Sequence, residues 1–226
     1  MRARRFLIAF LTCLLVPAAT SQDGAQPAQQ EAVGEAFAAL VITSHGRQVF
    51  DITTGLTTLP DGGRIYDART KVEVEASVIK YVEGQYIDAS GVVVSGEFGH
   101  FQAQKMHVDL VGSVLSASGE LWLSRDGLTL TAGSLEYYAN ENVKVFNGGV
   151  EGTEPDFYAD RLLLDTLTGD VLLDGRYMYA GAVFTMRSPE AGGRLHLKPQ
   201  QAGEDYVYAA ATEVSPTLLQ RFSAYL

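Results

Sequence analysis

The chain has 226 residues, of which 46% are hydrophobic and 19% charged, with 17 Lys and Arg against 27 Asp and Glu. The formal net charge of −10 makes nucleic acid an unfavourable partner, because its phosphates would be repelled and not neutralised. Otherwise the acidic balance bears on solubility and not on the fold.

The first 21 residues have the features of a secretory signal peptide. Arg2, Arg4 and Arg5 precede an apolar stretch over residues 6–16, and small residues follow it. This stretch is shorter than the ~20 residues that a spanning helix usually needs, so cleavage after export is favoured over retention as an anchor. Without the three arginines, 14 basic residues remain against 27 acidic ones, a net charge near −13.

Residues 22–40 are rich in Gln, Ala, Gly and Pro and predict a flexible tether, although the apolar residues 36–42 could form a short helix or a first strand. The main domain is expected over residues 41–198, a length that suits a single domain. Residues 199–226 form a C-terminal extension.

A repeated register runs through this domain. Four alanines recur 27, 29 and 27 residues apart, and a glycine follows each of them after 15 or 16 residues. A fixed period in this range is typical of stacked repeats. The alanines are Ala76, Ala103, Ala132 and Ala159, and the glycines are Gly91, Gly119, Gly148 and Gly175.

The repeat is expected to consist of β-strands. Apolar residues alternate with polar ones, as at Leu121 and Leu123, and clusters such as Asn140-Glu141-Asn142 separate the alternating stretches as turns would. The pattern predicts an all-β fold of some ten or more antiparallel strands and no helix between about Val41 and Leu197.

The sequence contains no Gly-x-Ser-x-Gly, Gly-x-Gly-x-x-Gly, phosphate-loop or His-Glu-x-x-His motif. His107 and Asp109 share a strand face, but a metal site would need further ligands there. Four acidic residues are expected at a solvent-facing edge and not in acid–base catalysis: Asp160, Asp165, Asp170 and Asp174. We therefore expect a binding or scaffold protein, not an enzyme, without cofactor or metal.

The string YADRLLLDTLTGDVLLDGRYMYAG has the cadence Ala-Asp-x-Leu-x-Leu-Asp followed by an apolar-x-Gly-x-apolar step. The string TAGSLEYYANENVKVFNGGV follows the first part more loosely, as Ala-Gly-Ser-Leu-Glu-Tyr-Tyr, and has the same glycine step. This cadence resembles the OstA-like family, the periplasmic lipopolysaccharide-transport proteins of the LptA and LptC type. The likeness covers about residues 41–197 and is clearest over 132–181.

The resemblance implies a repeat-built antiparallel β-jellyroll, an open and twisted V-shaped sandwich that holds acyl chains between two sheets. It also implies stacking with other such modules, or with itself, through edge strands, and transport of lipid or glycolipid to the outer membrane. The exported protein would then lie in the periplasm or cell envelope.

Eleven side chains are expected to point inward and contact lipid. They are Leu121, Leu123, Leu130, Ala132, Phe146, Val150, Phe157, Ala159, Leu173, Tyr177 and Phe184. If the two sheets splay apart, these residues line a slot for acyl chains. Each methylene that moves from water into the slot would stabilise binding by roughly 0.8 kcal/mol. If the sheets close tightly, the same residues are an ordinary core, and the protein is a scaffold that works through its strand edges.

Anionic headgroups gain no general attraction from an acidic carrier, so the cargo could also be another glycolipid or a phospholipid. The basic residues expected to flank the slot are few: Lys71, Lys80, Lys105, Lys144, Arg161 and Arg176.

The tail is expected to form a loop over Pro199 to Glu204 and, after Ser215-Pro216, a short helix. Leu218, Leu219, Phe222 and Tyr225 would lie on one face of it. The helix would cover one end of the sheets, or else dock on a neighbour or a membrane surface.

Overall fold

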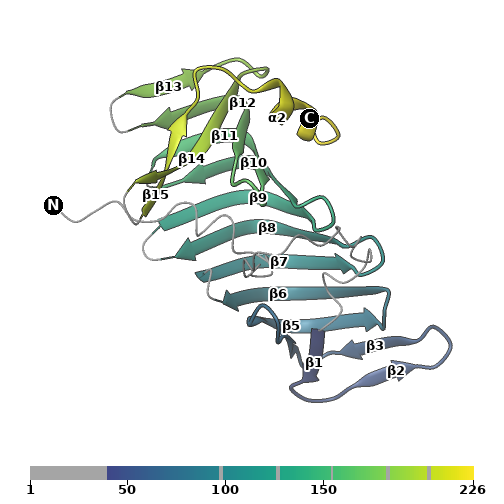
Figure 1. Ribbon diagram of the computed structural model, residues 1–226. Helices are drawn as coiled ribbons and strands as arrows, with labels where there is room; N and C mark the ends of the chain where they lie inside the picture. Colours follow the sequence, from purple (N-terminus) through teal and green to yellow (C-terminus); the bar gives the residue numbers. More distant parts are fainter. Residues whose placement is uncertain (1–39, 97–98, 126–127, 154, 182–183, 203–204) are drawn as a thin grey trace, which may run out of the picture.

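The computed structural model describes residues 40–96, 99–125, 128–153, 155–181, 184–202 and 205–226, and Figure 1 shows their arrangement. The described residues form one antiparallel sheet of 15 strands that does not close on itself, with a single short helix. The all-β antiparallel fold expected from the sequence is confirmed. The signal peptide and residues 22–39 of the expected tether lie outside the described residues, whereas Leu40, the last residue assigned to the tether, begins β1.

The strands follow one another along the sheet in nearly sequential order. Most are antiparallel neighbours joined by short turns, while the β2–β3 hairpin pairs with β5 and β13 pairs with β12. The bounds are β1 (Leu40–Ser44), β2 (Val49–Asp51), β3 (Leu56–Leu59), β4 (Gly63–Asp67), β5 (Val72–Val82), β6 (Tyr86–Gly96), β7 (Gly99–Asp109), β8 (Val114–Arg125), β9 (Leu128–Tyr138), β10 (Val143–Gly152), β11 (Phe157–Asp165), β12 (Val171–Ala180), β13 (Thr185–Ser188), β14 (Arg194–Ala202) and β15 (Asp205–Ala210), with the helix α2 (Pro216–Arg221).

The tail joins the sheet sooner than the sequence predicted. The expected loop from Pro199 to Glu204 is wrong over its first four residues, because β14 continues to Ala202 and Pro199 pairs with Tyr208 of β15. β14 pairs with β12 only as far as Leu197. Beyond that residue β15 is its single neighbouring strand, so the N–H that Pro199 lacks removes no hydrogen bond to β12. The expected domain boundary at residue 198 therefore falls inside a strand.

The four glycines of the repeated register lie in equivalent places. Each has a positive φ, at 59°, 85°, 84° and 89° for Gly91, Gly119, Gly148 and Gly175. Each also packs against the residue that follows one of the repeated alanines. A Cβ on Gly119 would lie 2.7 Å from Gln104 Cβ, for example, and one on Gly175 would lie 2.7 Å from Asp160 Cβ. We call these four residues the glycine row.

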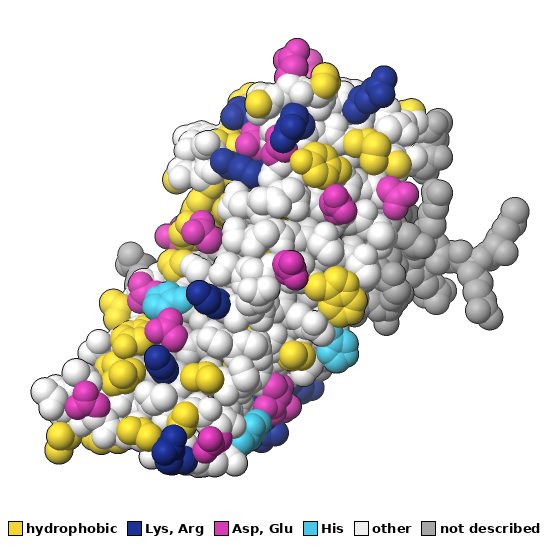
Figure 2. Space-filling model, turned by 180° about the vertical axis from the view of Figure 1, so that it is seen from behind, with side chains coloured by type: hydrophobic (Ala, Val, Ile, Leu, Met, Phe, Trp, Pro, Cys, Tyr) yellow, Lys and Arg dark blue, Asp and Glu magenta, His cyan; other side chains and the backbone are white. Residues whose placement is uncertain are grey.

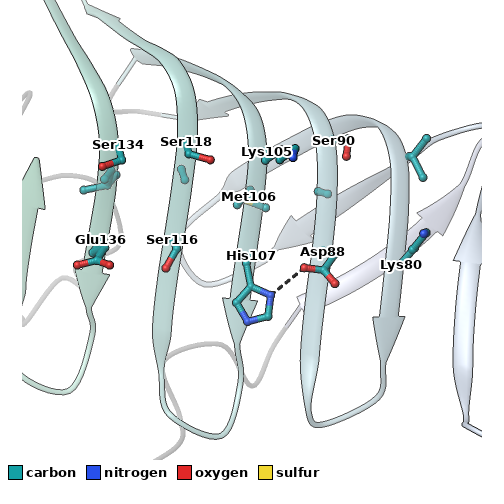
Figure 3. Close-up of a pocket in the computed structure, with 14 residues that line it drawn as sticks. Lys80, Asp88, Ser90, Lys105, Met106, His107, Ser116, Ser118, Ser134 and Glu136 are labelled. Atoms are coloured by element: carbon teal, nitrogen blue, oxygen red, sulfur yellow. Dashed lines mark hydrogen bonds and ion pairs between the residues drawn. The ribbon is translucent and has the colours of Figure 1, made fainter. Parts of the chain in front are cut away.

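The strand pairing shifts at this row. Register irregularities interrupt the ladders of β7 with β8, β8 with β9, β9 with β10, β10 with β11 and β11 with β12 there. In β7 the residues Ala103 and Met106, three apart, are both buried, so the two-residue alternation changes phase between them. Bulges and glycine kinks of this kind bend a strand. Figure 3 shows the strands turning over beyond Ser118 and Ser134.

The glycine row divides the long strands into two halves, which we call layers. Layer A comprises residues 72–76, 92–96, 99–103, 121–125, 128–132, 150–152, 157–159 and 177–180, and layer B comprises residues 79–82, 86–89, 106–109, 114–117, 135–138, 143–146, 162–165 and 171–173. Buried apolar side chains of both layers belong to one continuous cluster that extends from Leu59 to Tyr208. Because every long strand crosses the row, the layers are joined along one side.

The helix α2 covers the outer side of layer B over β10 to β12. Ser215 is extended at its N-cap and Pro216 follows at the first helical position, as the sequence predicted. Leu218 and Phe222 are buried in a second apolar cluster with Val143, Val145, Leu163 and Leu172. The helix therefore covers a face of the sheet, and not one end of it.

A methyl group in the glycine row should destabilise the fold. Gly119→Ala places a side chain at a positive φ and against Gln104, so we expect the free energy of unfolding to fall by about 1–3 kcal/mol. Gly192→Ala is the control, since its Cβ would meet open space at an ordinary φ. Urea unfolding measures both variants, and equal stabilities would contradict the role given to the row.

Truncation of the buried helix residue tests whether α2 is a structural cover. Phe222→Ala removes a fully buried ring, and we expect a loss of about 3–5 kcal/mol in the free energy of unfolding. Gln220→Ala on the exposed side of the same helix should change it by less than about 0.5 kcal/mol. Unchanged stability in Phe222→Ala would instead indicate a helix held for docking on a partner.

Candidate functional site

An apolar cavity of about 60 Å³ lies between the two layers, at the end of the sheet nearer β1. Both layers contribute to it, and β1 and β4 close it. Its lining comprises Val72, Val74, Val94 and Phe101 from layer A, Ile87, Met106, Val108, Leu115 and Leu135 from layer B, and Leu40, Ile65 and Asp67 from β1 and β4. Only Asp67 among these carries a polar side chain.

The cavity is small for a ligand. An apolar cavity that holds one benzene has about 150 Å³, so this space is less than half as large. An acyl chain could enter only if the layers separate or the flexible side chains, such as Met106, move aside. The two layers are linked through the strands at the glycine row. Near the C-terminus they are also connected at the opposite rim, because the Tyr208 carbonyl accepts from the Tyr179 hydroxyl of layer A and the Tyr208 hydroxyl donates to the carbonyl of Gly169, in the turn beyond layer B.

Most of the eleven predicted contact residues lie elsewhere, in the packed interior. Nine are buried in the main apolar cluster: Leu121, Leu123, Leu130, Ala132, Phe146, Val150, Phe157, Ala159 and Leu173. Tyr177 is partly buried against the same cluster. Their inward orientation agrees with the period-two pattern. Within the described part of the chain, however, the cavity lining includes none of the eleven.

The inward orientation expected for Phe184 is wrong. Its side chain is 60% exposed, because the residue lies in the turn between β12 and β13 and not in a ladder. The Gly181 N–H donates to the Phe184 carbonyl at 3.0 Å and closes this turn. Strand alternation does not apply to a turn residue.

The cavity residues were missed although some of them carry the same signal. Val72 and Val74 alternate with Glu73 and Glu75 as clearly as the predicted residues alternate with polar ones, whereas Val94 stands in the run Val92-Val93-Val94 and carries no such signal. The eleven predicted residues lie between 121 and 184, around the stretch 132–181 where the family resemblance is clearest. Alternation identifies an inward face, but it does not show where along that face space remains.

Lys144 is buried inside the fold and not at the rim, contrary to the expectation that it flanks the slot. It is 0% exposed, and its Nζ lies 5.0 Å from the centre of the Tyr137 ring, a cation–π contact. It pairs with Tyr137 and Leu164, both in the main apolar cluster, so it shares their inward face. The same burial raises the pKa of Tyr137 to about 12.

A second hollow, of about 540 Å³, lies on the outer side of layer B and is shown in Figure 3. Its side chains form two rows across the strands because the register aligns them. One row is Lys80, Asp88, His107, Ser116 and Glu136, and the other includes Ser90, Lys105, Ser118 and Ser134. The two rows carry both signs of charge, and apolar residues such as Val78 and Ala89 complete the lining.

Asp88, His107 and Ser116 are neighbours in this row and have the side-chain types of a catalytic triad. His107 Nδ1 lies 2.8 Å from Asp88 Oδ1, and about half of each of these two side chains is exposed. Triad chemistry also needs a bond from the histidine to the serine and donors for an oxyanion. The structure gives Ser116 no such bond within its described residues, and the backbone here pairs in the ladders. The sequence predicts that His107 and Asp109 share a strand face. Among the described residues, they belong to no group of three or more side chains that could hold a metal ion.

The four aspartates expected at a solvent-facing edge are engaged with basic residues. Asp165 is buried, caps the following turn and contacts Arg221 Nε at 2.8 Å, so a solvent-facing position is wrong for it. Asp170 contacts His196 and Asp174 contacts Arg194. Arg176 binds Asp160 through two side-chain bonds and one backbone bond, and these hold the pKa of that carboxyl at about 2.

Among the described residues no group of three or more His, Cys, Asp and Glu side chains is placed to hold a metal ion. In that same part of the chain no helix is both long enough and apolar enough to cross a membrane. No family model matches this sequence, and no curated protein matches it. The resemblance to the OstA-like family stays a prediction.

The Asp160 pair should give a defined acid dependence. Because the folded pKa of about 2 is below the usual value of 3.8, its contribution to stability is present above about pH 4 and is lost as pH falls through 2. We expect the melting temperature of Asp160→Asn to lie below that of the wild type at neutral pH, with the difference closing between about pH 4 and pH 2. Asp156→Asn serves as the control at an exposed position. A difference that does not change with pH would contradict the pairing.

Proposed function

We propose that this protein is a non-enzymatic, exported lipid or glycolipid carrier of the periplasm or cell envelope. It would hold acyl chains between the two layers of an open, V-shaped jellyroll and pass them toward the outer membrane. The observation that supports this function best is the apolar cavity lined by both halves of one creased, unclosed sheet.

Binding would require the cavity to grow. The layers are joined along the glycine row, so separation at the opposite rim changes the angle between them without breaking the ladders within each layer. Each acyl methylene that enters the cavity stabilises binding by roughly 0.8 kcal/mol. A chain of several carbons would therefore offset the free energy lost when the layers give up contacts with each other. The tightly packed residues around Leu121 and Leu173 would touch lipid only after this opening, whereas those around Met106 would touch it first.

A second candidate is a scaffold that assembles through its ends and carries no lipid. It is favoured by exposed apolar side chains on β2, since Phe50 is 61% exposed and Ile52, just beyond the strand, is 88% exposed. Figure 2 shows hydrophobic side chains gathered at the end of the molecule that holds β2 and β3. Such side chains beside a strand edge suit the addition of another sheet.

Photo-crosslinking at neighbouring positions of β6 tests the lipid slot. Val94 faces the cavity, whereas Val93 faces outward on the same strand. With a photoreactive leucine at one or the other position, the exported protein should label co-purified or added lipid from residue 94 and much less from residue 93.

Equal labelling from the two positions would contradict the slot. Native mass spectrometry of the same samples reports bound lipid and association together. Stacked species that carry no lipid, even after detergent-solubilised lipid is supplied, would favour the scaffold.

A further inference from the structure

Asp67 is a buried carboxyl group in the wall of the apolar cavity. It ends β4 at the rim of layer A, its side chain is 1% exposed, and it lines the cavity with Ile65 and Val72. The other lining side chains are apolar. Carboxyl groups are seldom buried unless both oxygens have hydrogen-bond or ion-pair partners, so the burial of Asp67 in an apolar wall requires an explanation.

One oxygen of Asp67 has a structural role and the other has none. Oδ1 accepts from the Arg69 N–H at 2.9 Å and lies 3.6 Å from Arg69 Nε, so it caps the turn between β4 and β5. Oδ2 is buried and accepts no hydrogen bond from any described residue. Thr70 Oγ1, in the same turn, is also buried without a partner there.

The capping of the turn does not account for Oδ2. Asp109 caps the turn after β7 in a similar way, with its Oδ1 accepting from Val111 N–H and Gly112 N–H, and it does not line the cavity. A serine or asparagine could cap such a turn without a second, negatively charged oxygen. The second oxygen of Asp67 is therefore available to a ligand.

We propose that Asp67 is the polar recognition group of the lipid slot, and that it selects amphiphiles whose headgroup donates a hydrogen bond, an ammonium or a hydroxyl, beside the acyl chain. This inference rests on the proposed lipid-binding function. A buried carboxylate accepts and does not donate, so an N–H or O–H at the end of a chain satisfies Oδ2. A carboxylate or phosphate group placed there would be repelled.

The position of Asp67 orients the ligand. It lies at the rim, where the chain passes from β4 to the turn, while Met106 and Leu135 lie on layer B. A headgroup bound at Asp67 therefore lies beside the turn from β4 to β5, and its chain extends between the layers toward Met106 and Leu135. This arrangement resolves a difficulty of the acidic composition, because a carrier near −13 attracts cationic headgroups in preference to anionic ones.

Four probes with the same tail separate these contributions: tetradecylamine, tetradecanol, tetradecyltrimethylammonium and tetradecanoate. Each is added to the exported protein at pH 7, below the concentration at which the probe aggregates or separates from water, and binding is measured by calorimetry. We expect the amine and the alcohol to bind at least about tenfold more tightly than tetradecanoate. The trimethylammonium probe has the charge of the amine but no N–H donor, so we expect it to bind more weakly than the amine.

Asp67→Asn is the decisive variant, because the side chain keeps its shape and its Oδ1 can still accept from the Arg69 N–H. Its amide nitrogen then replaces Oδ2, so a hydrogen-bond donor takes the place of the acceptor in the cavity wall. We expect it to weaken amine binding at least about tenfold and to leave or improve tetradecanoate binding. Asp109→Asn, the matched turn cap outside the cavity, should bind all four probes as the wild type does.

The outcomes separate the two proposals. If no probe binds, both the lipid slot and the role of Asp67 are wrong. If all four bind the wild type with equal affinity, or Asp67→Asn binds them as the wild type does, the slot stands and the selection by Asp67 is overturned. Should Asp67→Asn fail to fold, the comparison of the amine with the trimethylammonium probe on the wild type decides the question, because the two have the same charge and differ in the N–H donor; equal affinities would overturn the selection by Asp67.

Discussion

The structure depends on one backbone constraint, the row of positive-φ glycines across the sheet. A residue with a side chain at Gly119 or Gly175 would adopt an unfavourable conformation and also collide with the neighbouring strand. These glycines allow each long strand to bend near its middle and shift the pairing there. The bend sets the inward faces of both halves of a strand in one apolar cluster, so a single sheet supplies both walls of the interior.

The two ends of this interior differ. Toward the C-terminus the space is filled by residues such as Phe146 and Leu173, and α2 covers the outer face of layer B. Toward β1 the interior retains a cavity, bounded by apolar side chains and Asp67. Packing thus fills the interior toward the C-terminus and leaves space in it toward β1.

The sequence predicted what local patterns determine. Alternation over residues such as Leu121 and Leu123 identified strands and their buried faces, and Ser215-Pro216 identified the helix start. The prediction failed where a residue leaves the regular ladder: Phe184 lies in a turn, and Pro199 sits where its strand has one neighbour. Contacts that depend on register across the bulges were not predictable from spacing. The pair of Asp88 with His107, 19 residues apart, is one, and the placement of Asp67 against the other layer is another.

The most direct test of this account is the distance between the two layers with and without an amphiphile. Spin labels at His100 on layer A and Lys80 on layer B are both exposed, and pulsed electron paramagnetic resonance measures their separation. The account predicts a longer or broader distance distribution when a long-chain amphiphile binds, because the layers turn about the glycine row. Tight binding with an unchanged distribution would show that the cargo does not enter between the layers.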